Sequence, residues 1–153
     1  MKLDQLFRRI QATPNKGRNV ESFLFRRLPT FWNQNKEWID DDGGISNWVN
    51  LQMSNGDRLP PFELRGYRNP MNKAEIVLHW TAMVFQEDEV DDRLNVVALC
   101  DDQIEIYLAT DYLRTKRKAT FKFNFPTNKP IRCYVFFSDH ENETYSPSIQ
   151  IEL

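Results

Sequence analysis

Between residues 62 and 153, turn signals divide the chain into short apolar segments at a regular spacing. Each segment is rich in branched or aromatic residues and is bounded by Gly, Pro, Asn or Asp, a pattern typical of β-strands. No part of this region has a helical period. Seven short strands at this spacing predict an all-β fold, a seven-stranded antiparallel β-sandwich. We expect the strands near residues 62–67, 74–84, 93–100, 103–109, 118–125, 131–138 and 145–152.

Two of these segments contain the largest candidate core residues. Ala74–Met83 carries Trp80, and Ile131–Ser138 carries Tyr134 among several other large apolar residues. We therefore interpret the two segments as inner strands of the sandwich.

A two-residue connection, Asp101-Asp102, separates the expected strands at 93–100 and 103–109. A connection this short predicts that the two strands form a hairpin.

A basic run, Arg114–Lys118, leads into a strand in which Phe alternates with polar residues. Basic residues interleaved with aromatic rings can bind single-stranded nucleic acid. The alternation, however, places Phe121, Phe123 and Phe125 on one face, as a core strand requires. We interpret the three rings as core.

Leu59, Pro60 and Pro61 mark a break, because a proline pair fits a linker that enters an edge strand. We take residues 1–60 as a basic, mostly irregular N-terminal arm and residues 61–153 as the sandwich domain. The arm is long enough to wrap an unpaired sandwich edge, on its own subunit or on a neighbour's.

Two elements are expected within the arm. Residues 1–12 predict a short amphipathic helix that is too small to be stable alone and must pack on its own domain or on a partner. Residues 45–53 alternate well enough to predict a strand, followed by a hairpin-type turn at Asn55-Gly56. The apolar face of the helix is formed by Leu3, Leu6, Phe7 and Ile10.

Charge is divided unevenly along the chain. Residues 1–36 hold eight Lys and Arg against two acidic residues, a balance of +6. The remaining residues hold 12 basic and 20 acidic side chains, a balance of −8, so the net charge is −2. This asymmetry predicts docking of the arm onto an acidic surface of its own chain or of a neighbour. Nucleic acid is the other possible target of the arm.

Four short motifs stand out in the second part of the chain: Pro60–Leu64, Ile76–Trp80, Tyr134–Phe137 and Thr144–Ile151. Together they resemble the motifs of a fibronectin type III-like module. That module has a proline-led first strand, a Trp in its second strand, a Tyr in its sixth and a Ser-Pro-Ser-type entry to its last. Roughly residues 60–153 also resemble the C-terminal sandwich of an uncharacterised family of Bacteroidota proteins. The resemblance implies a sandwich fold and no established activity.

The titratable residues show no spacing typical of catalysis or of a metal site. We expect His79 on the strand face opposite Trp80, and His140 in a solvated turn. Cys100 and Cys133 lie on separate predicted strands, and we expect free, buried thiols rather than a disulfide. The acidic clusters lack the spacing of an EF-hand loop and are interpreted as solubilising turns. We therefore expect no enzyme activity, no cofactor and no metal.

The first residues lack the apolar run and the small-residue cleavage site of a signal peptide. No apolar run approaches the roughly 20 residues that a transmembrane helix requires. We expect a cytoplasmic protein, or one carried inside a virion or another assembled particle.

These observations predict a non-enzymatic structural or adaptor subunit of a larger assembly, such as a phage virion or a bacterial injection machine. The sandwich would be the scaffold, and the arm would contact protein subunits of the same or a neighbouring type. One alternative is a module that binds carbohydrate or another ligand through Trp32, Trp38 or Trp48. A second alternative is nucleic-acid binding through the basic arm. The expected partner-binding residues are Leu3, Leu6, Phe7, Arg8, Arg9, Phe23, Phe25, Arg26, Arg27, Phe31 and Trp32.

Overall fold

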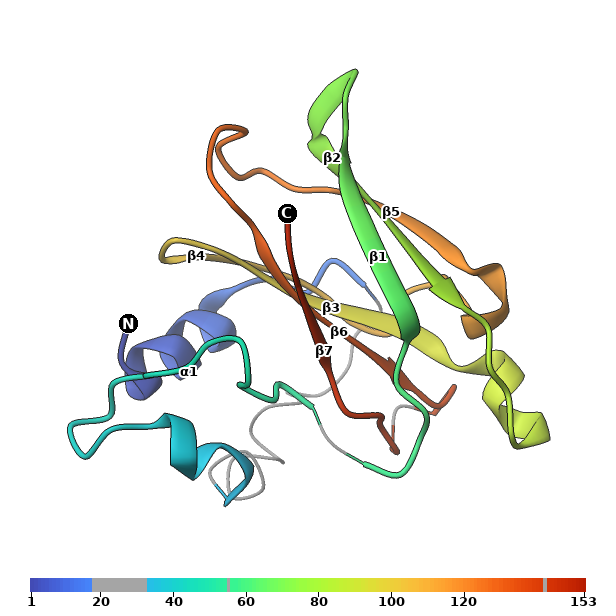
Figure 1. The fold of residues 1–153 in the computed structure, drawn as a ribbon, viewed down its shortest axis with the longest axis horizontal. Coiled ribbons are helices and arrows are strands. Elements are labelled where there is room, and N and C mark those ends of the chain that lie inside the picture. Colours follow the sequence, from blue (N-terminus) through green and yellow to red (C-terminus); the bar gives the residue numbers. More distant parts are fainter. Residues whose placement is uncertain (18–32, 55, 142) are drawn as a thin grey trace.

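The computed structural model describes residues 1–17, 33–54, 56–141 and 143–153. Within them, seven strands form two antiparallel sheets that face each other (Figure 1). The strands are β1 (Phe62–Asn69), β2 (Asn72–Thr81), β3 (Arg93–Cys100), β4 (Gln103–Tyr107), β5 (Lys118–Lys122), β6 (Arg132–Ser138) and β7 (Ile149–Glu152). The strand order is β1-β2-β5 in one sheet and β4-β3-β6-β7 in the other. The predicted all-β sandwich is confirmed.

The strands follow the predicted spacing, and β3 has exactly the predicted bounds. The hairpin between β3 and β4 is also confirmed, with Cys100 paired to Gln103 across the turn. Asp101 adopts a positive φ of 51° there, a conformation that Asp tolerates better than most residues. β7 is shorter than predicted because Pro147 has no N–H to donate, and the preceding Ser146 accepts the Phe137 N–H with its side chain.

The first core fills the space between the two sheets. Trp80 of β2 lies edge-on to Phe137 of β6, with ring centroids 5.9 Å apart. β2 is the central strand of its sheet, and β6 is internal to the other, so both expected inner strands are confirmed. The three alternating rings that β5 and the residues after it contribute, Phe121, Phe123 and Phe125, are also buried here, as predicted.

A second core lies on the outer face of the four-stranded sheet, beneath the N-terminal arm. The helix α1 (Leu3–Ala12) places Leu6 and Ile10 against this face, where they are 0% and 7% exposed. Leu51 and Met53, from the loop before β1, complete the cover. The molecule therefore has three layers: the small sheet, the large sheet and the arm (Figure 1). The sheet residues of this second core are Val97, Leu99, Ile104, Ile106, Leu108, Tyr134, Phe136 and Tyr145.

The arm also covers part of an exposed sheet edge. The backbone N–H of Lys16 donates to the Ile106 carbonyl of β4 at 3.0 Å, and the Leu108 N–H donates to Asn15 Oδ1 at 2.9 Å. A Cβ on Gly17 would lie 1.7 Å from the Leu108 carbonyl oxygen, so this close approach requires glycine. The described part of the arm thus protects an edge of its own chain.

The predicted strand at 45–53 does not form. Leu51 and Met53 do alternate into the core, but the segment pairs only through an isolated bridge between Ile45 and Ile39, beside which the Ser46 N–H donates to the Trp38 carbonyl at 2.8 Å. Further along the segment, side chains satisfy the backbone. Asn35 accepts the Gln52 N–H at 2.7 Å and donates to the Gln52 carbonyl at 2.9 Å, and Ser148 Oγ accepts the Met53 N–H at 3.0 Å. The turn expected after the strand includes Asn55, which lies outside the described residues.

The described residues also include three short 3₁₀ helices, η1 (Lys36–Trp38), η2 (Glu87–Asp91) and η3 (Arg114–Lys116). Two of them, η2 and η3, contact each other at one end of the sandwich. Among the described residues, no helix has the length and apolar character needed to cross a bilayer.

Candidate functional site

An exposed apolar patch lies at the end of the sandwich where η2 and η3 meet. Phe85 is 72% exposed, and Val84 and Val90 are 37% and 39% exposed. A phenyl ring exposed to this degree, with two exposed valines near it in the chain, marks a candidate interaction surface. We call Val84, Phe85 and Val90 the end patch.

The end patch has an acidic border and a basic border. Glu87, Asp88 and Asp91 of η2 are exposed on one side. The exposed side chains of Lys116, Arg117 and Lys118 follow along η3 and the start of β5. Within the described chain, none of these three cations takes part in an ion pair. Apolar, negative and positive surface are therefore adjacent at one end of the molecule.

A buried ionic network fixes these elements relative to one another. Asp92 is fully buried and lies 2.6 Å from both Arg114 and Arg58. Arg114 is itself 1% exposed and also donates to the carbonyls of Leu59 and Met83. Removing one member of such a network leaves an uncompensated buried charge and costs about 3–5 kcal/mol. The end patch is thus presented on a rigid support.

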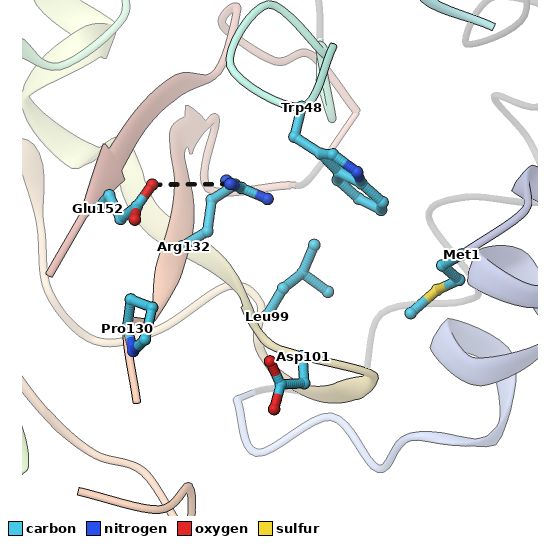
Figure 2. A pocket seen from close by; sticks show the side chains of 7 residues that line it. All are labelled: Met1, Trp48, Leu99, Asp101, Pro130, Arg132 and Glu152. Carbon is cyan, nitrogen blue, oxygen red and sulfur yellow. Dashed lines mark ion pairs between the residues drawn. The ribbon is translucent and has the colours of Figure 1, made fainter. Parts of the chain in front are cut away.

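A separate pocket of about 230 Å³ opens where the arm meets the four-stranded sheet (Figure 2). It collects side chains from five distant segments of the chain. The loop that carries Trp48 is held in place because Tyr134 Oη donates to the Trp48 carbonyl at 2.7 Å. The lining residues are Met1, Trp48, Leu99, Asp101, Pro130, Arg132 and Glu152.

Arg132 is the central polar group of this pocket. Its guanidinium carbon lies 5.6 Å from the centre of the Trp48 ring, a cation–π arrangement. Its Nη2 lies 3.6 Å from Glu152 Oε2, which is an ion pair across the β6–β7 register. Its Nε is buried and has no hydrogen-bond partner. Within the described residues, the guanidinium donates no hydrogen bond at all.

The structure describes five of the residues expected to bind a partner. Leu6 is fully buried, while Leu3 and Phe7 are partly buried in the second core. Arg9 forms an ion pair with Asp102 at 3.1 Å, and the side chain of Arg8 is 80% exposed. Leu6 therefore packs inside its own chain. That the helix also contacts another subunit stays a prediction. The remaining expected residues, Phe23, Phe25, Arg26, Arg27, Phe31 and Trp32, lie outside the described residues.

Within the described residues, two cations of the arm contact acidic side chains of the sandwich, which is one of the two outcomes that the charge asymmetry predicted. Besides Arg9, the ammonium group of Lys16 contacts the Glu105 carboxylate. Glu105 is 7% exposed and also accepts the Asn124 backbone N–H at 2.7 Å. These arm charges are neutralised within the chain.

The remaining titratable residues lie largely as expected. His79 is half-buried on the outer face of its sheet and stacks on Tyr67, with ring centroids 5.9 Å apart. His140 is exposed in a turn. Cys100 and Cys133 are free and buried, as predicted, and belong to the same core. Among the described residues, no three His, Cys, Asp or Glu side chains are grouped so that they could hold a metal ion.

Sequence reasoning missed both the end patch and the pocket. The end patch had a usable signal, since Val84 ends the inner strand predicted at 74–84 and Phe85 follows it directly, before a run of carboxylates. In the structure β2 already ends at Thr81. The pocket had only a partial signal in Trp48, because Arg132 and Glu152 meet through the register of β6 and β7, and the other lining residues come from separate segments.

Comparisons of the chain with protein-family models, with curated proteins and with solved structures find no match.

Proposed function

We propose that the chain is a non-enzymatic structural or adaptor subunit that assembles with further copies of itself. The end patch is the observation that carries this proposal, since an exposed aromatic ring with apolar neighbours and a charged rim is the usual anatomy of a protein interface. The sandwich is the scaffold. One of its sheets contains β1, β2 and β5, and the other contains β4, β3, β6 and β7. This division supports a fibronectin type III-like module. A phage virion or a bacterial injection machine is the kind of assembly to which such a subunit would belong.

The arrangement of charge favours a second copy as the partner. In a twofold-symmetric contact the same surface is used by both subunits, so it must be complementary to itself. Here the acidic border of one copy would face the basic border of the other, and the reverse, around two Phe85 rings at the centre. Docking of the described arm charges on their own chain favours this surface over the arm as the contact.

Light scattering coupled to size-exclusion chromatography tests the proposal on the full chain at rising protein concentration. We expect reversible self-association that weakens in high salt, because the charged borders are exposed. Phe85→Ser should weaken it about tenfold or more, as truncation of a central aromatic anchor does. Met71→Ser is the matched control, since Met71 is 93% exposed at the β1–β2 turn, away from the end patch. A chain that stays monomeric at every concentration contradicts the proposal.

Charge reversal distinguishes a self-complementary contact from unspecific association. One variant carries Lys116→Glu and Lys118→Glu, and the other carries Glu87→Lys and Asp91→Lys. Each variant alone should be monomeric, because each then presents two borders of the same sign. An equimolar mixture should associate again. If the mixture did not associate, the twofold-symmetric contact would be contradicted, even if the wild-type chain self-associates.

A further inference from the structure

We propose that the pocket around Trp48 and Arg132 binds a single neutral sugar ring or a comparable polyol. The proposal does not rest on the assembly role. The pocket includes the turn that follows the last residue of β3, whereas the end patch precedes its first residue, so an eight-residue strand separates the two sites. At about 3.3 Å per residue, that strand spans roughly 25 Å.

The walls of the pocket differ in chemistry. Trp48 provides an aromatic surface, and Leu99 and Pro130 provide aliphatic surface (Figure 2). The polar groups, Arg132 and Glu152, meet on one side of the cavity, where the ion pair between them is drawn. A ligand that fits must therefore have an apolar face and a polar rim.

The polar groups complement a ligand that both donates and accepts hydrogen bonds. Arg132 is a donor only, and its guanidinium donates no hydrogen bond within the described part of the chain. When it is ionised, Glu152 can only accept hydrogen bonds, and its side chain is 53% exposed. A hydroxyl has one donor and two acceptor positions, so neighbouring hydroxyls on a ring can engage both side chains at once. The C–H face of the same ring can pack on the indole of Trp48.

Charged ligands fit less well. A carboxylate or phosphate on Arg132 would meet Glu152 and also Asp101, which lines the pocket from the β3–β4 turn. A cation between the carboxylates would meet the guanidinium. Asp101 is already paired with Lys129, which further reduces its value as a ligand for a cation. A neutral ligand meets neither repulsion.

The size of the pocket sets the size of the ligand. Pockets for drug-sized ligands usually measure about 300–1,000 Å³. At about 230 Å³ this cavity is smaller, and it suits one ring rather than an extended chain. Binding of an isolated ring should accordingly be weak, because the contact area is small.

Isothermal titration calorimetry of the full chain tests the proposal with glucose, galactose, mannose and N-acetylglucosamine, and with acetate and methylammonium as charged probes. We expect saturable binding of at least one sugar and no competition from either charged probe. Trp48→Ala and Arg132→Gln should each weaken that binding about tenfold, because each removes one principal contact. Glu152→Gln, at a half-exposed side chain near the end of β7, tests the acceptor without disturbing the core.

Trp38→Ala is the matched control, because Trp38 is partly exposed but does not line the pocket. It should leave sugar binding unchanged, and a urea unfolding curve of each variant should show that it is folded. Three results would overturn the inference. These are no binding of any sugar, equal loss of binding in Trp38→Ala and Trp48→Ala, or tighter binding of acetate than of every sugar.

Discussion

At the residue scale, burial changes the chemistry of Cys133. The thiol is fully buried between the sheets, and desolvation of its thiolate raises its pKa from 9.0 to about 12. The unfolded chain releases this proton near the ordinary value, so the folded state binds it more tightly. Stability from this difference is fully present below pH 9 and is lost as the pH rises towards 12. We expect the thiol to lower the free energy of unfolding by about 1 kcal/mol between pH 9 and pH 10.

Urea unfolding at the two pH values measures this effect. Cys133→Ala removes the titrating group, so its free energy of unfolding should fall by about 1 kcal/mol less than that of the wild type over the same interval. Comparing these differences separates the thiol from other groups that titrate in alkali. Equal losses in the two proteins would show that the Cys133 thiol does not resist ionisation in the fold.

The same scale shows where sequence reasoning was incomplete. The burial of Cys133 and of the three alternating Phe rings followed from their strand positions alone. Arg114 did not. It belongs to a basic run whose other members are exposed, and its burial depends on Asp92, which lies 22 residues earlier in the chain. A charge is buried only where a partner is present, and a partner that distant has no local signal.

At the element scale, strands with one buried face differ in sequence pattern from strands with two buried faces. β5 alternates because only one of its faces is buried. β3 and β6 are nearly continuous apolar runs because both of their faces are covered. Val97 and Tyr134, for example, face the arm rather than the opposite sheet. Continuous runs in an antiparallel sheet thus indicated a third layer, and the prediction of two sheets with a separate arm did not use that signal.

The helix α1 gives the element-scale prediction. Leu6 is fully buried against the large sheet, so Leu6→Ala should reduce the free energy of unfolding by about 2–5 kcal/mol. Arg8→Ala, on the opposite face of the helix, should change it by about 0.5 kcal/mol or less, since its ion pair with Asp4 is exposed. Urea unfolding of both variants measures this. If Leu6→Ala left stability unchanged but altered self-association, the helix would be a partner contact rather than an internal cover.

At the scale of the whole molecule, the pocket and the arm depend on each other. Trp48 belongs to the arm, whereas Arg132 and Glu152 face each other across β6 and β7. Their pairing could have been predicted once the register of those strands was known, because opposite charges favour facing positions. The approach of Trp48 could not have been predicted, because the loop at 45–54 has only one isolated bridge and is placed by the side chains of Asn35 and Ser148.

We expect the sandwich domain to require the arm in order to stay soluble. In a chain of residues 61–153 the outer face of the large sheet would lose α1, Leu51 and Met53 together. The residues then exposed are Val97, Leu99, Ile104, Ile106, Tyr134 and Phe136. A contiguous apolar surface of this kind, beside the uncovered edge of β4, is a site for aggregation. We expect the truncated chain to elute as large aggregates in size-exclusion chromatography with light scattering, under conditions in which the full chain stays soluble.

Two further chains make this result specific to the lost cover. Val97→Thr with Ile106→Thr in the truncated chain keeps the β-branched shape while reducing apolar surface, and should recover part of its solubility. Adding residues 1–60 as a separate peptide should recover more, because the peptide can restore the same contacts. A truncated chain that is a folded, soluble monomer would instead mean that the sandwich is stable without its third layer. The arm would then be available to a partner, as the sequence alone predicted.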